Sequence, residues 1–584
     1  MKIIRFAVNG FRGINGGLDN NSVNFENSNT IFIFGQNNTG KSSFLAAYNN
    51  FYMNSEPEME DFHMQDLKNE IVYELEVELD EYDKQRMNEV SAKANFLFNN
   101  YVQNNRLRLQ KIWRIEDGGK GKKQSIKSSN KTFDPSKKIW DEKDYGGIGL
   151  HEVFRECLPQ PILIKAMPTE IEVESTVQQV LTTKAQESLE AKDNKKLKEA
   201  VKVIEELRDK MFDPARIENY RTKVNEQFQK LFSDTAISFN PQAGKNNLTL
   251  AALTRKIEVK FDRLNEDGSI NSNIPSSYSK IGHGAIRAAL FTLFLMKDIA
   301  EGFERKEGKK NYLVLFEEPE LFLHPKLLKA LRSLIYQVSK NDTPYQILCA
   351  SHSPQMIDIT QPKSSLVRMV KRKNGTKLFQ IDESFLMETK SRVKRELYEA
   401  LRFNPHICES FYADEVILVE GDTEAIILRA YLQSRDTAKD LFVVNCASVN
   451  NIPFFQEVFS KFNIKYHVVC DSDGRFDGKY DNHNNPIFSQ YIQGSIYNLI
   501  KKDSESKDYK PGIFRIHEPN FEDAHRKIPT QDLRFPFDDS AIKNDGKPLC
   551  ANEYWNKILG PKIESSKIEE VPIIKNLCEI IDNN

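Results

Sequence analysis

Two sets of residues in this 584-residue chain have the types and spacing needed to bind phosphate and metal ions. The first is the segment Gly35–Ser42, with the sequence GQNNTGKS, which fits the GxxxxGK[ST] pattern of a phosphate-binding loop. The second is a set of carboxylates much further along the chain: Glu420, Glu424, Asp471 and Asp473. Carboxylate oxygens are the ligands that Mg²⁺ and Mn²⁺ prefer. The first set therefore predicts a nucleotide triphosphate site, and the second predicts divalent metal held against a phosphodiester.

The residues on either side of the glycine loop provide the context that a phosphate site requires. An apolar run, Thr30–Phe34, predicts a strand that enters the loop, and Ser42–Phe51 predicts a helix that leaves it. In that position the helix N-terminus binds phosphate oxygens, Lys41 neutralises β- and γ-phosphate charge, and the Ser42 hydroxyl binds Mg²⁺. The alternative is a chance match in a Gly/Asn turn, which the flanking strand and helix disfavour.

Two acidic residues follow a second apolar run and predict a site that activates water. The run Leu313–Phe316 is typical of a strand, and it ends in Glu317 and Glu318. Glu317 stands where an aspartate usually binds Mg²⁺, and Glu318 stands at the position of the general base. His352 follows the predicted strand 346–349, where ABC-type ATPases have a histidine that senses γ-phosphate. The alternative is a strand with a solvated acidic end.

A glycine-containing segment, Lys280–Arg287, opens a predicted helix upstream of that acidic strand. This is the position of the ABC signature, whose helix N-terminus clamps the nucleotide of the opposite subunit, but the residues depart from the usual Ser-Gly-Gly. Together with the opening Asn9–Gly13, these motifs resemble the ABC ATPases of the SMC, recombination-protein-F and Rad50 group. The resemblance implies a homodimer or a higher homo-oligomer, and it implies ATP binding more firmly than ATP turnover. The predicted nucleotide-binding residues are Gly35, Asn38, Gly40, Lys41, Ser42, Ser43, Gly282, Gly284, Glu317 and His352.

The downstream carboxylates lie at the ends of two further predicted strands. The apolar run Val416–Val419 ends in Glu420, and Glu424 lies on the first turn of a helix that begins near Thr423. A second apolar run, Tyr466–Cys470, ends in Asp471-Ser472-Asp473. Because the carboxyl ends of parallel strands meet at one edge of a sheet, these acids should converge there. Two metal ions in such a site stabilise the attacking and leaving oxygens of a phosphodiester. The alternative is that the carboxylates only cap strands and helices.

This arrangement resembles the Toprim domain of topoisomerases, primases and OLD-family nucleases. The resemblance implies that Glu518–Asp523 supplies another metal ligand, either Glu522 or Asp523, and that Lys547 balances charge in the transition state. The predicted catalytic residues are Glu420, Glu424, Asp471, Asp473 and Lys547, with Glu318 in the ATPase half. The predicted metal ligands are Glu420, Glu424, Asp471, Asp473, Glu522 or Asp523 and, at the nucleotide, Ser42.

Taken together, the two halves resemble the OLD (overcoming lysogenization defect) family over nearly the whole chain. The predicted fold class is α/β: an ABC-type, SMC/Rad50-like ATPase head with a helical insertion, followed by a Rossmann-like Toprim domain. We place the ATPase domain at 1–405, with a possibly dimerising insertion at about 175–235, and the Toprim nuclease domain at 406–584. The resemblance implies an endonuclease acting on DNA, with ATP and with Mg²⁺, Mn²⁺ or Ca²⁺ at both sites, commonly in phage defence.

Three other functions stay open at this point. One is an RNase or tRNA nuclease that uses the same Toprim site. Another is a non-catalytic DNA-repair ATPase of the recombination-protein-F type, against which the Asp471-Ser472-Asp473 motif argues. The third is an effector that needs a separately encoded, helicase-like partner for cleavage.

Composition limits how the chain meets nucleic acid and where it works. The formal net charge of −2 excludes a global positive field, so binding needs a local stripe such as residues 101–140, which carry eleven Lys/Arg against three acids. The alternative for that stretch is a solvated basic hairpin. The seven cysteines form no CxxC pair, which favours a reducing compartment. No apolar leader or 18-residue apolar run is present, so we expect a cytoplasmic protein without a membrane span.

Overall fold

The structure is a computed structural model that describes the chain except for residues 67, 92–93, 117–124, 142–156, 168–213, 230–234, 242–256, 272–285, 287, 290, 293–310, 340–342, 359–362, 374, 382–404, 436–439, 506–511 and 583–584. It divides into two compact units, Met1–Leu378 and Phe379–Asn584. Gly282, Gly284 and most of the predicted insertion 175–235 lie outside the described residues. So does the segment 382–404, and the domain boundary at 405/406 therefore stays a prediction.

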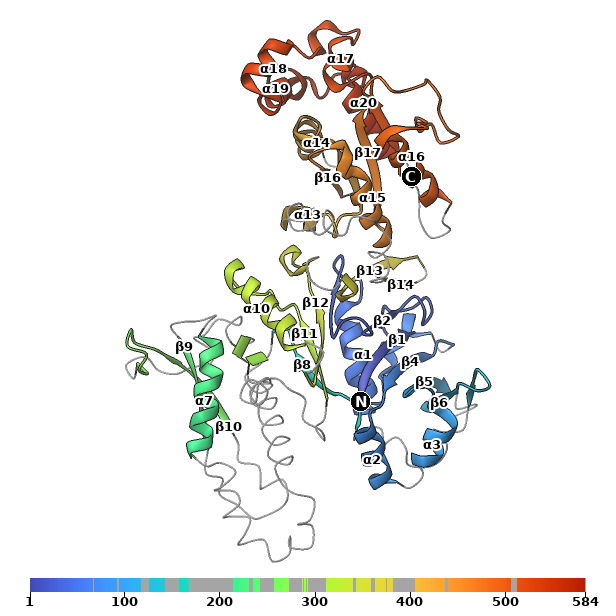
Figure 1. Ribbon diagram of the computed structural model, residues 1–584, viewed down its shortest axis with the longest axis vertical. Coiled ribbons are helices and arrows are strands. Elements are labelled where there is room, and N and C mark those ends of the chain that lie inside the picture. Colours follow the sequence, from blue (N-terminus) through green and yellow to red (C-terminus); the bar gives the residue numbers. More distant parts are fainter. Residues whose placement is uncertain are drawn as a thin grey trace, which may run out of the picture. The chain divides into compact units, whose positions relative to one another are not determined.

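An antiparallel sheet of strand order β2-β1-β4-β5-β6-β7 forms one part of the N-terminal unit (Figure 1). Its strands are β1 (Lys2–Asn9), β2 (Ser22–Asn24), β4 (Ile71–Glu78), β5 (Arg106–Glu116), β6 (Ser125–Asp134) and β7 (Ile139–Asp141). In β4, every second residue from Ile71 to Val77 is apolar and buried, which is the period of a strand with one face in the core. Helices α2 (Glu81–Val90) and α3 (Ala94–Tyr101) follow β4.

A second sheet, of order β14-β13-β3-β12-β11-β8, contains the nucleotide-binding motifs. Its strands are β3 (Thr30–Phe34), β8 (Gln160–Ile164), β11 (Tyr312–Glu317), β12 (Tyr345–Ala350), β13 (Leu366–Arg372) and β14 (Gly375–Gln380). Strands β13, β3, β12, β11 and β8 pair in parallel with one another, so the segments that follow β3, β11 and β12 lie at one edge.

Two helices hold this second sheet in place. Helix α1 (Lys41–Met53) packs against β8, β11 and β12 and also against β1 and β4 of the antiparallel sheet (Figure 1). Its Phe44 and Tyr48 rings lie 5.6 and 5.3 Å from the ring of Phe6 on β1. Helix α10 (Pro325–Val338) buries Leu328, Leu331, Ile335 and Val338, which recur at helical spacing. The helix after the phosphate-binding loop is thus anchored to both sheets.

A helix and a hairpin represent the described end of the predicted insertion. Helix α7 (Pro214–Phe228) begins at the proline, a residue well suited to the first helical turn. It packs against β9 (Thr235–Pro241), which pairs with β10 (Ile257–Arg263) in antiparallel register. The Asn225 amide joins them, since its side chain donates to the carbonyl of Ile237 and accepts from the N–H of the same residue.

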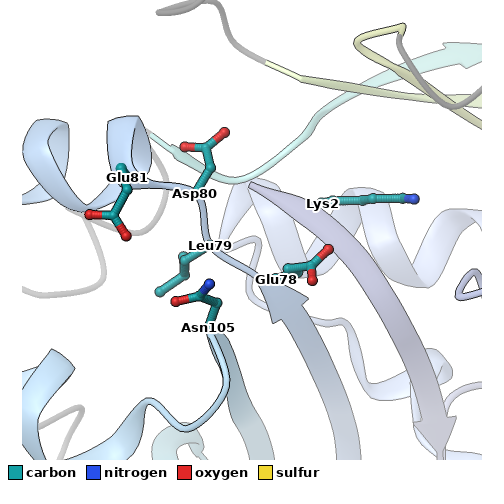
Figure 2. A pocket seen from close by; sticks show the side chains of 6 residues that line it. All are labelled: Lys2, Glu78, Leu79, Asp80, Glu81 and Asn105. Carbon is teal, nitrogen blue, oxygen red and sulfur yellow. The ribbon is translucent and has the colours of Figure 1, made fainter.

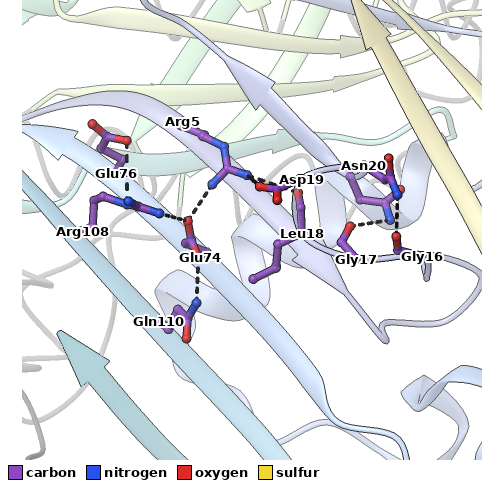
Figure 3. Close-up of polar contacts among 11 residues, drawn as sticks. Arg5, Gly16, Gly17, Leu18, Asp19, Asn20, Glu74, Glu76, Arg108 and Gln110 are labelled. Carbon is purple, nitrogen blue, oxygen red and sulfur yellow. Dashed lines mark hydrogen bonds and ion pairs between the residues drawn. The ribbon is translucent and has the colours of Figure 1, made fainter. Parts of the chain in front are cut away.

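The basic stretch 101–140 includes β5 and β6, and two arginines of β5 face carboxylates on β4 and directly before it. Arg108 contacts Glu74 at 2.8 Å, and Arg114 contacts Glu70 at 2.6 Å. Figure 3 shows Glu74 between Arg5 of β1 and Arg108, with the Gln110 amide donating to its second oxygen at 2.7 Å. Because these charges neutralise one another within the sheet, the pairing argues against a phosphate-binding stripe along β5.

The N-terminal unit also has a pocket of about 360 Å³ near the start of β1 and the end of β4 (Figure 2). Lys2 and Glu78 line it together with the turn 79–81 and Asn105. Burial lowers the pKa of Lys2, and the nearby Glu78 carboxylate opposes that shift. None of its lining residues belongs to the sets that the sequence predicts for catalysis or nucleotide binding.

The C-terminal unit is built on a parallel sheet of order β16-β15-β17-β18. Its strands are β15 (Glu415–Val419), β16 (Leu441–Asn445), β17 (Lys465–Asp471) and β18 (Phe514–His517). Its helices are α13 (Pro405–Glu409), α14 (Asp422–Ser434), α15 (Ile452–Lys461), α16 (Tyr491–Ser504), α17 (Phe521–Arg526), α18 (Asp539–Asp545), α19 (Lys547–Tyr554) and α20 (Pro572–Asp582).

Strand β15 lies in the middle of the core of this unit and is buried along its whole length. Ile417 and Val419 pack in one apolar cluster with residues of α14, α19 and α20. Helix α15 packs against β15 and β17 and against α16. A buried parallel strand with helices packed on it is the arrangement of a doubly wound sheet, whose ligands bind beyond the carboxyl ends of the strands.

In the described part of the chain, we find no helix with the length and hydropathy that crossing a bilayer requires.

Candidate functional site

The two glycines of the phosphate-binding loop have backbone positions that other residues rarely adopt. Gly35, directly after β3, has φ +146°, and a Cβ there would lie 2.3 Å from the carbonyl oxygen of Met369 on β13. Gly40 has φ +103° and directly precedes α1. Asn38, between them, is also left-handed at φ 58°. The spacing of the glycines in the pattern therefore follows from the path of this backbone.

Lys41, the first residue of α1, points back into the loop. It is only 4% exposed, and its ammonium donates to the carbonyls of Gly35 and Gln36 at 2.8 and 2.7 Å. Burial lowers the pKa of Lys41 to about 8, against the opposing charges of Glu318 and Glu320. A phosphate would compete with these carbonyls for the same donors. The predicted partner Ser42 is exposed on the first turn of the helix, and Ser43 beside it is partly exposed.

The acids that follow β11 meet the histidine that follows β12. Glu318 Oε1 lies 3.9 Å from His352 Nε2, and the backbone N–H of His352 donates to Glu320 Oε1 at 2.5 Å. Glu317 Oε2 accepts the N–H of Ala166 at 3.3 Å. Burial lowers the pKa of His352, and the charge of Lys41 lowers it further. The edge of this sheet thus brings the predicted lysine, base and histidine together.

The carboxylates of the C-terminal unit converge beyond the ends of β15 and β17. These strands pair in parallel with Val419 opposite Val469, which places Glu420 near Asp471. Glu424, on the first turn of α14, is only 4% exposed. Burial raises the pKa of Glu420 to about 7, and the neighbouring charges of Asp471 and Glu424 raise it as well. Burial raises the pKa of Glu424 too. Holding these carboxylates ionised close together therefore costs free energy, and a bound cation would lower that cost.

Asp473 lies on the exposed rim of the same cluster. Its backbone is left-handed at φ 53°, and its Oδ2 accepts from the Gln493 amide at 3.1 Å. Arg475 Nη1 lies 3.6 Å from the same oxygen. The Asp473 charge contributes to the raised pKa of Glu420, which places it within electrostatic reach of the buried carboxylates.

The late acidic element presents one of its two acids to the cluster. Glu522 is buried, and its Oε1 lies 2.8 Å from the ammonium of Lys547, the first residue of α19. The charges of Asp471 and Glu424 also act on Lys547 and help raise its pKa. Asp523 instead lies 3.5 Å from Arg526 and donates its backbone N–H to the cap residue Asn520. The geometry favours Glu522 over Asp523 as the residue that faces the site.

Sequence reasoning missed His517, the last residue of β18. It lies opposite Asp471 in the register of the sheet, and its Nδ1 is 3.5 Å from Asp471 Oδ1. Atoms of Glu424, Asp471 and His517 that can bind a metal all lie within 4.8 Å of one another. One signal in the sequence could have identified it. His517 ends a strand directly before Glu518–Asp523, and a position at a strand end was also what identified Glu420 and Asp471.

The polar atoms of this site are in a state that suits a bound divalent cation. Among the described residues, the buried Asp471 Oδ1 and both ring nitrogens of His517 have no hydrogen-bond partner. Buried polar atoms without partners are rare and costly in folded proteins. Carboxylate and imidazole groups are ordinary ligands of divalent metals, so one ion would satisfy several of these atoms at once.

Two family models match the chain in the order that the sites suggest. Residues 1–357 match the model described as an AAA ATPase domain, which covers more than half of the chain. Residues 411–473 match the model described as an overcoming lysogenization defect protein-like TOPRIM domain, and this range includes Glu420, Glu424, Asp471 and Asp473. The molecule is thus an ATPase head joined to a Toprim domain, and the predicted α/β fold class is confirmed.

Three curated proteins that are named as nucleases are similar to parts of this chain. The chain is 23% identical to the Old nuclease of Escherichia phage P2 over 56% of this chain and 55% of that protein. It is 25% identical to the OLD nuclease of Thermus scotoductus over 43% and 47%, and 20% identical to Endonuclease GajA of Bacillus cereus over 39% and 34%. The chain belongs to the AAA ATPase domain family, and its residues 411–473 are similar to the TOPRIM domain of overcoming lysogenization defect proteins. These matches span about half the length of the curated relatives.

A solved structure also aligns with part of the chain. It is an SMC head bound to the C-terminal winged-helix domain of ScpA, with a TM-score of 0.38 and 11% identity, over 67% of this chain and 100% of that chain. The fold class rests on the strand order and the family matches instead.

Proposed function

We propose that this chain is an ATP-binding endonuclease that hydrolyses phosphodiester bonds in DNA at the Toprim carboxylates. The proposal rests on one observation above all, which is that Glu420, Glu424 and Asp471 converge at one sheet edge, where the buried Asp471 Oδ1 has no hydrogen-bond partner in the described part of the chain. Three relatives whose names describe them as nucleases support it. The name of GajA describes an endonuclease, and the family resemblance favours a role in phage defence.

Each residue of the carboxylate site has a distinct part in this proposal. Glu420 and Asp471 are the principal ligands, and Glu424, Asp473 and Glu522 complete one or two positions for Mg²⁺, Mn²⁺ or Ca²⁺. When bound, such an ion makes water a stronger nucleophile and stabilises charge on the phosphate. Lys547, held 2.8 Å from Glu522, offers its ammonium to the negative charge that grows on the phosphate oxygens.

The N-terminal unit would bind ATP through the phosphate-binding loop and Lys41. Ser42 and Glu317 would hold its Mg²⁺, Glu318 would accept a proton from the attacking water, and His352 would contact γ-phosphate. Two heads facing each other would complete each nucleotide site through the segment that contains Gly282 and Gly284. A homodimer is therefore the smallest assembly that we propose, and a separately encoded helicase-like partner stays open.

An exposed aromatic residue beside the carboxylates favours a nucleic acid substrate. Tyr491 is 63% exposed, and the Arg475 guanidinium lies 4.5 Å from the centre of its ring. Arg475 in turn lies 3.6 Å from Asp473. An aromatic ring and an arginine can stack on an unpaired base and contact its phosphate. This surface suits a strand that is locally unpaired at the site of cleavage.

The test is cleavage of supercoiled plasmid and of single-stranded RNA by the full chain with Mg²⁺, Mn²⁺ or Ca²⁺, with and without ATP. We expect metal-dependent nicking or linearisation of the plasmid that is lost in Asp471→Asn. The matched control is Asp477→Asn, which removes an exposed carboxylate six residues further along and should leave cleavage unchanged. Cleavage of RNA alone would move the substrate to RNA, and no cleavage of either polymer would contradict the proposal.

A further inference from the structure

A fully buried imidazole faces the carboxylate cluster without any hydrogen bond to its nitrogens. The side chain of His517 has no exposed surface, and neither Nδ1 nor Nε2 has a partner among the described residues. Its Nδ1 is 3.5 Å from Asp471 Oδ1, which is too long for a good N–H···O bond, and that oxygen is itself without a partner. A neutral imidazole leaves one nitrogen with a free lone pair, which is the state that binds metal.

The other buried histidines of this unit are fully occupied. His525 contacts the carbonyl of Phe521 through Nδ1 and accepts the N–H of Ile573 at Nε2. His467 binds Glu415 through Nε2 at 2.8 Å and accepts the N–H of Ile513 at Nδ1. Both rings therefore have structural roles. The unpaired nitrogens of His517 are a local exception beside the carboxylates.

Packing fixes the direction in which the His517 ring points. The ring lies edge-on to Phe521 at 5.3 Å and next to the ring of His525 at 5.2 Å. Its backbone carbonyl accepts the N–H of Ser472, the residue after Asp471, at 2.9 Å. Because both the ring and the backbone are held, His517 and Asp471 keep a constant spacing, as the ligands of a metal site require.

We propose that His517 is a nitrogen ligand of the Toprim metal site and makes the site prefer Mn²⁺ to Mg²⁺ and Ca²⁺. This deepens the proposed function by assigning the metal specificity of the same site. Mg²⁺ and Ca²⁺ take oxygen ligands almost exclusively, whereas first-row transition ions also bind imidazole well. With Glu424 and Asp471, the imidazole forms a ligand set of mixed nitrogen and oxygen atoms whose members lie within 4.8 Å of one another.

The experiment uses Mn²⁺ alone as the probe, on the full chain without nucleotide or DNA. Pulsed electron paramagnetic resonance detects nitrogen nuclei bound to Mn²⁺, and calorimetry measures the affinities for Mn²⁺ and Mg²⁺. We expect coupling to one imidazole nitrogen in the wild type. In His517→Gln this coupling disappears, Mn²⁺ affinity falls by at least about tenfold, and Mg²⁺ affinity changes by less than about threefold. His483→Gln, a change at an exposed histidine, should behave as the wild type.

Either of two results would overturn the assignment. One is a wild-type Mn²⁺ spectrum without nitrogen coupling, which needs no variant and so does not depend on whether His517→Gln folds. The other is an equal loss of Mn²⁺ and Mg²⁺ affinity in a folded His517→Gln, which would make His517 a positioning residue only. Because no cleavage is measured, a chain that binds Mn²⁺ through nitrogen but cuts no nucleic acid would contradict the proposed function and leave this assignment standing.

Discussion

The nucleotide site of the N-terminal unit and the carboxylate site of the C-terminal unit solve opposite electrostatic problems. In the first, the Lys41 ammonium is already paired with the carbonyls of Gly35 and Gln36, and one of the two carboxylate oxygens of Glu320 accepts the backbone N–H of His352. In the second, Asp471 Oδ1 is unpaired among the described residues, and burial together with the charges of Asp471 and Glu424 raises the pKa of Glu420. The lysine of the loop therefore has hydrogen-bond partners without a ligand, whereas the carboxylate cluster needs cations to offset its negative charge.

This difference shows how each site is encoded. The loop uses eight consecutive residues whose backbone does most of the work, so its geometry is set locally. The carboxylate site takes residues from the ends of β15, β17 and β18 and from the starts of α14 and α19, so only the assembled sheet creates it. Mutations should therefore act on folding and nucleotide in the first site, and on metal and catalysis in the second.

Among the variants that test this difference between the two sites, Lys547→Met should have the largest effect. Loss of the ammonium should reduce cleavage by about 100-fold or more, since one charge-stabilising group is typically worth that much in the transition state. Affinity for Mn²⁺ should stay equal or rise, because Glu522 and the buried carboxylates lose a competing cation. Plasmid cleavage rates and Mn²⁺ titrations measure the two quantities. A parallel fall in both would show that Lys547 only supports the fold.

Gly35→Ala tests the claim that the loop is built by backbone. At φ +146°, with Cβ 2.3 Å from the Met369 carbonyl, the substitution should cost at least about 2 kcal/mol of stability and weaken ATP binding. Gly13→Ala is the matched control, since a Cβ there meets nothing within 4 Å. Chemical denaturation and binding of a fluorescent ATP analogue provide the readouts. Equal stability of the two variants would contradict the steric argument.

The pH dependence of metal binding should be confined to the carboxylate site. Because the pKa of Glu420 is raised from 4.5 to about 7, its carboxyl is mostly protonated at pH 6 and ionised at pH 8. Mn²⁺ affinity should therefore fall as pH drops through 7, by up to about tenfold per unit. Glu420→Gln should flatten this profile. A wild-type profile without a slope between pH 6 and 8 would contradict it.

The same pKa shift predicts the opposite sign for the stability of the metal-free protein. A carboxyl whose pKa is higher in the folded state favours folding when it is protonated, so stability should decrease as pH rises from about 4.5 through 7. Mn²⁺ should reverse this loss. Thermal unfolding at pH 5.5 and 7.5, with and without the metal, compares the four conditions, and a metal-free protein that is more stable at pH 7.5 would count against the assignment.

The smallest effect is expected at the rim of the carboxylate site. Tyr491→Ala should weaken binding of single-stranded DNA by about fivefold, in line with roughly 1 kcal/mol for one stacked base, and should leave the cleavage rate of bound DNA unchanged. Tyr480→Ala, a change at another exposed tyrosine that precedes α16, serves as the control. Fluorescence anisotropy with a labelled oligonucleotide separates them, and equal affinities would remove Tyr491 from the substrate surface.

Sequence patterns predicted the parts of each site that follow from local backbone. The strand Thr30–Phe34 has the bounds of β3, and the helix predicted at Ser42–Phe51 corresponds to α1, Lys41–Met53. The strand ends at Glu420 and Asp471 could be located because apolar runs stop there. The order of an ATPase half and a Toprim half followed from these motifs, and the family matches confirm it.

Sequence alone could not determine which side chains pair after folding. The choice between Glu522 and Asp523 depends on Lys547 and Arg526, which approach from different sides. His517 belongs to the cluster only because β18 pairs with β17 in a register that sets it opposite Asp471. In the same way, Arg108 and Arg114 of β5 look free in the sequence, but Arg108 faces Glu74 of β4 and Arg114 faces Glu70 directly before that strand. These are tertiary contacts, and no local sequence pattern predicts them.

If one site binds ATP and a separate site cleaves nucleic acid, a variant of either site should leave the function of the other intact. Binding of a fluorescent ATP analogue, binding of Mn²⁺ and cleavage of supercoiled plasmid are measured on Lys41→Ala and on Asp471→Asn. We predict that Asp471→Asn loses cleavage and keeps ATP affinity within about twofold, whereas Lys41→Ala loses ATP binding and keeps its Mn²⁺ site. Cleavage that survives in Asp471→Asn, with ATP binding intact, would contradict the account.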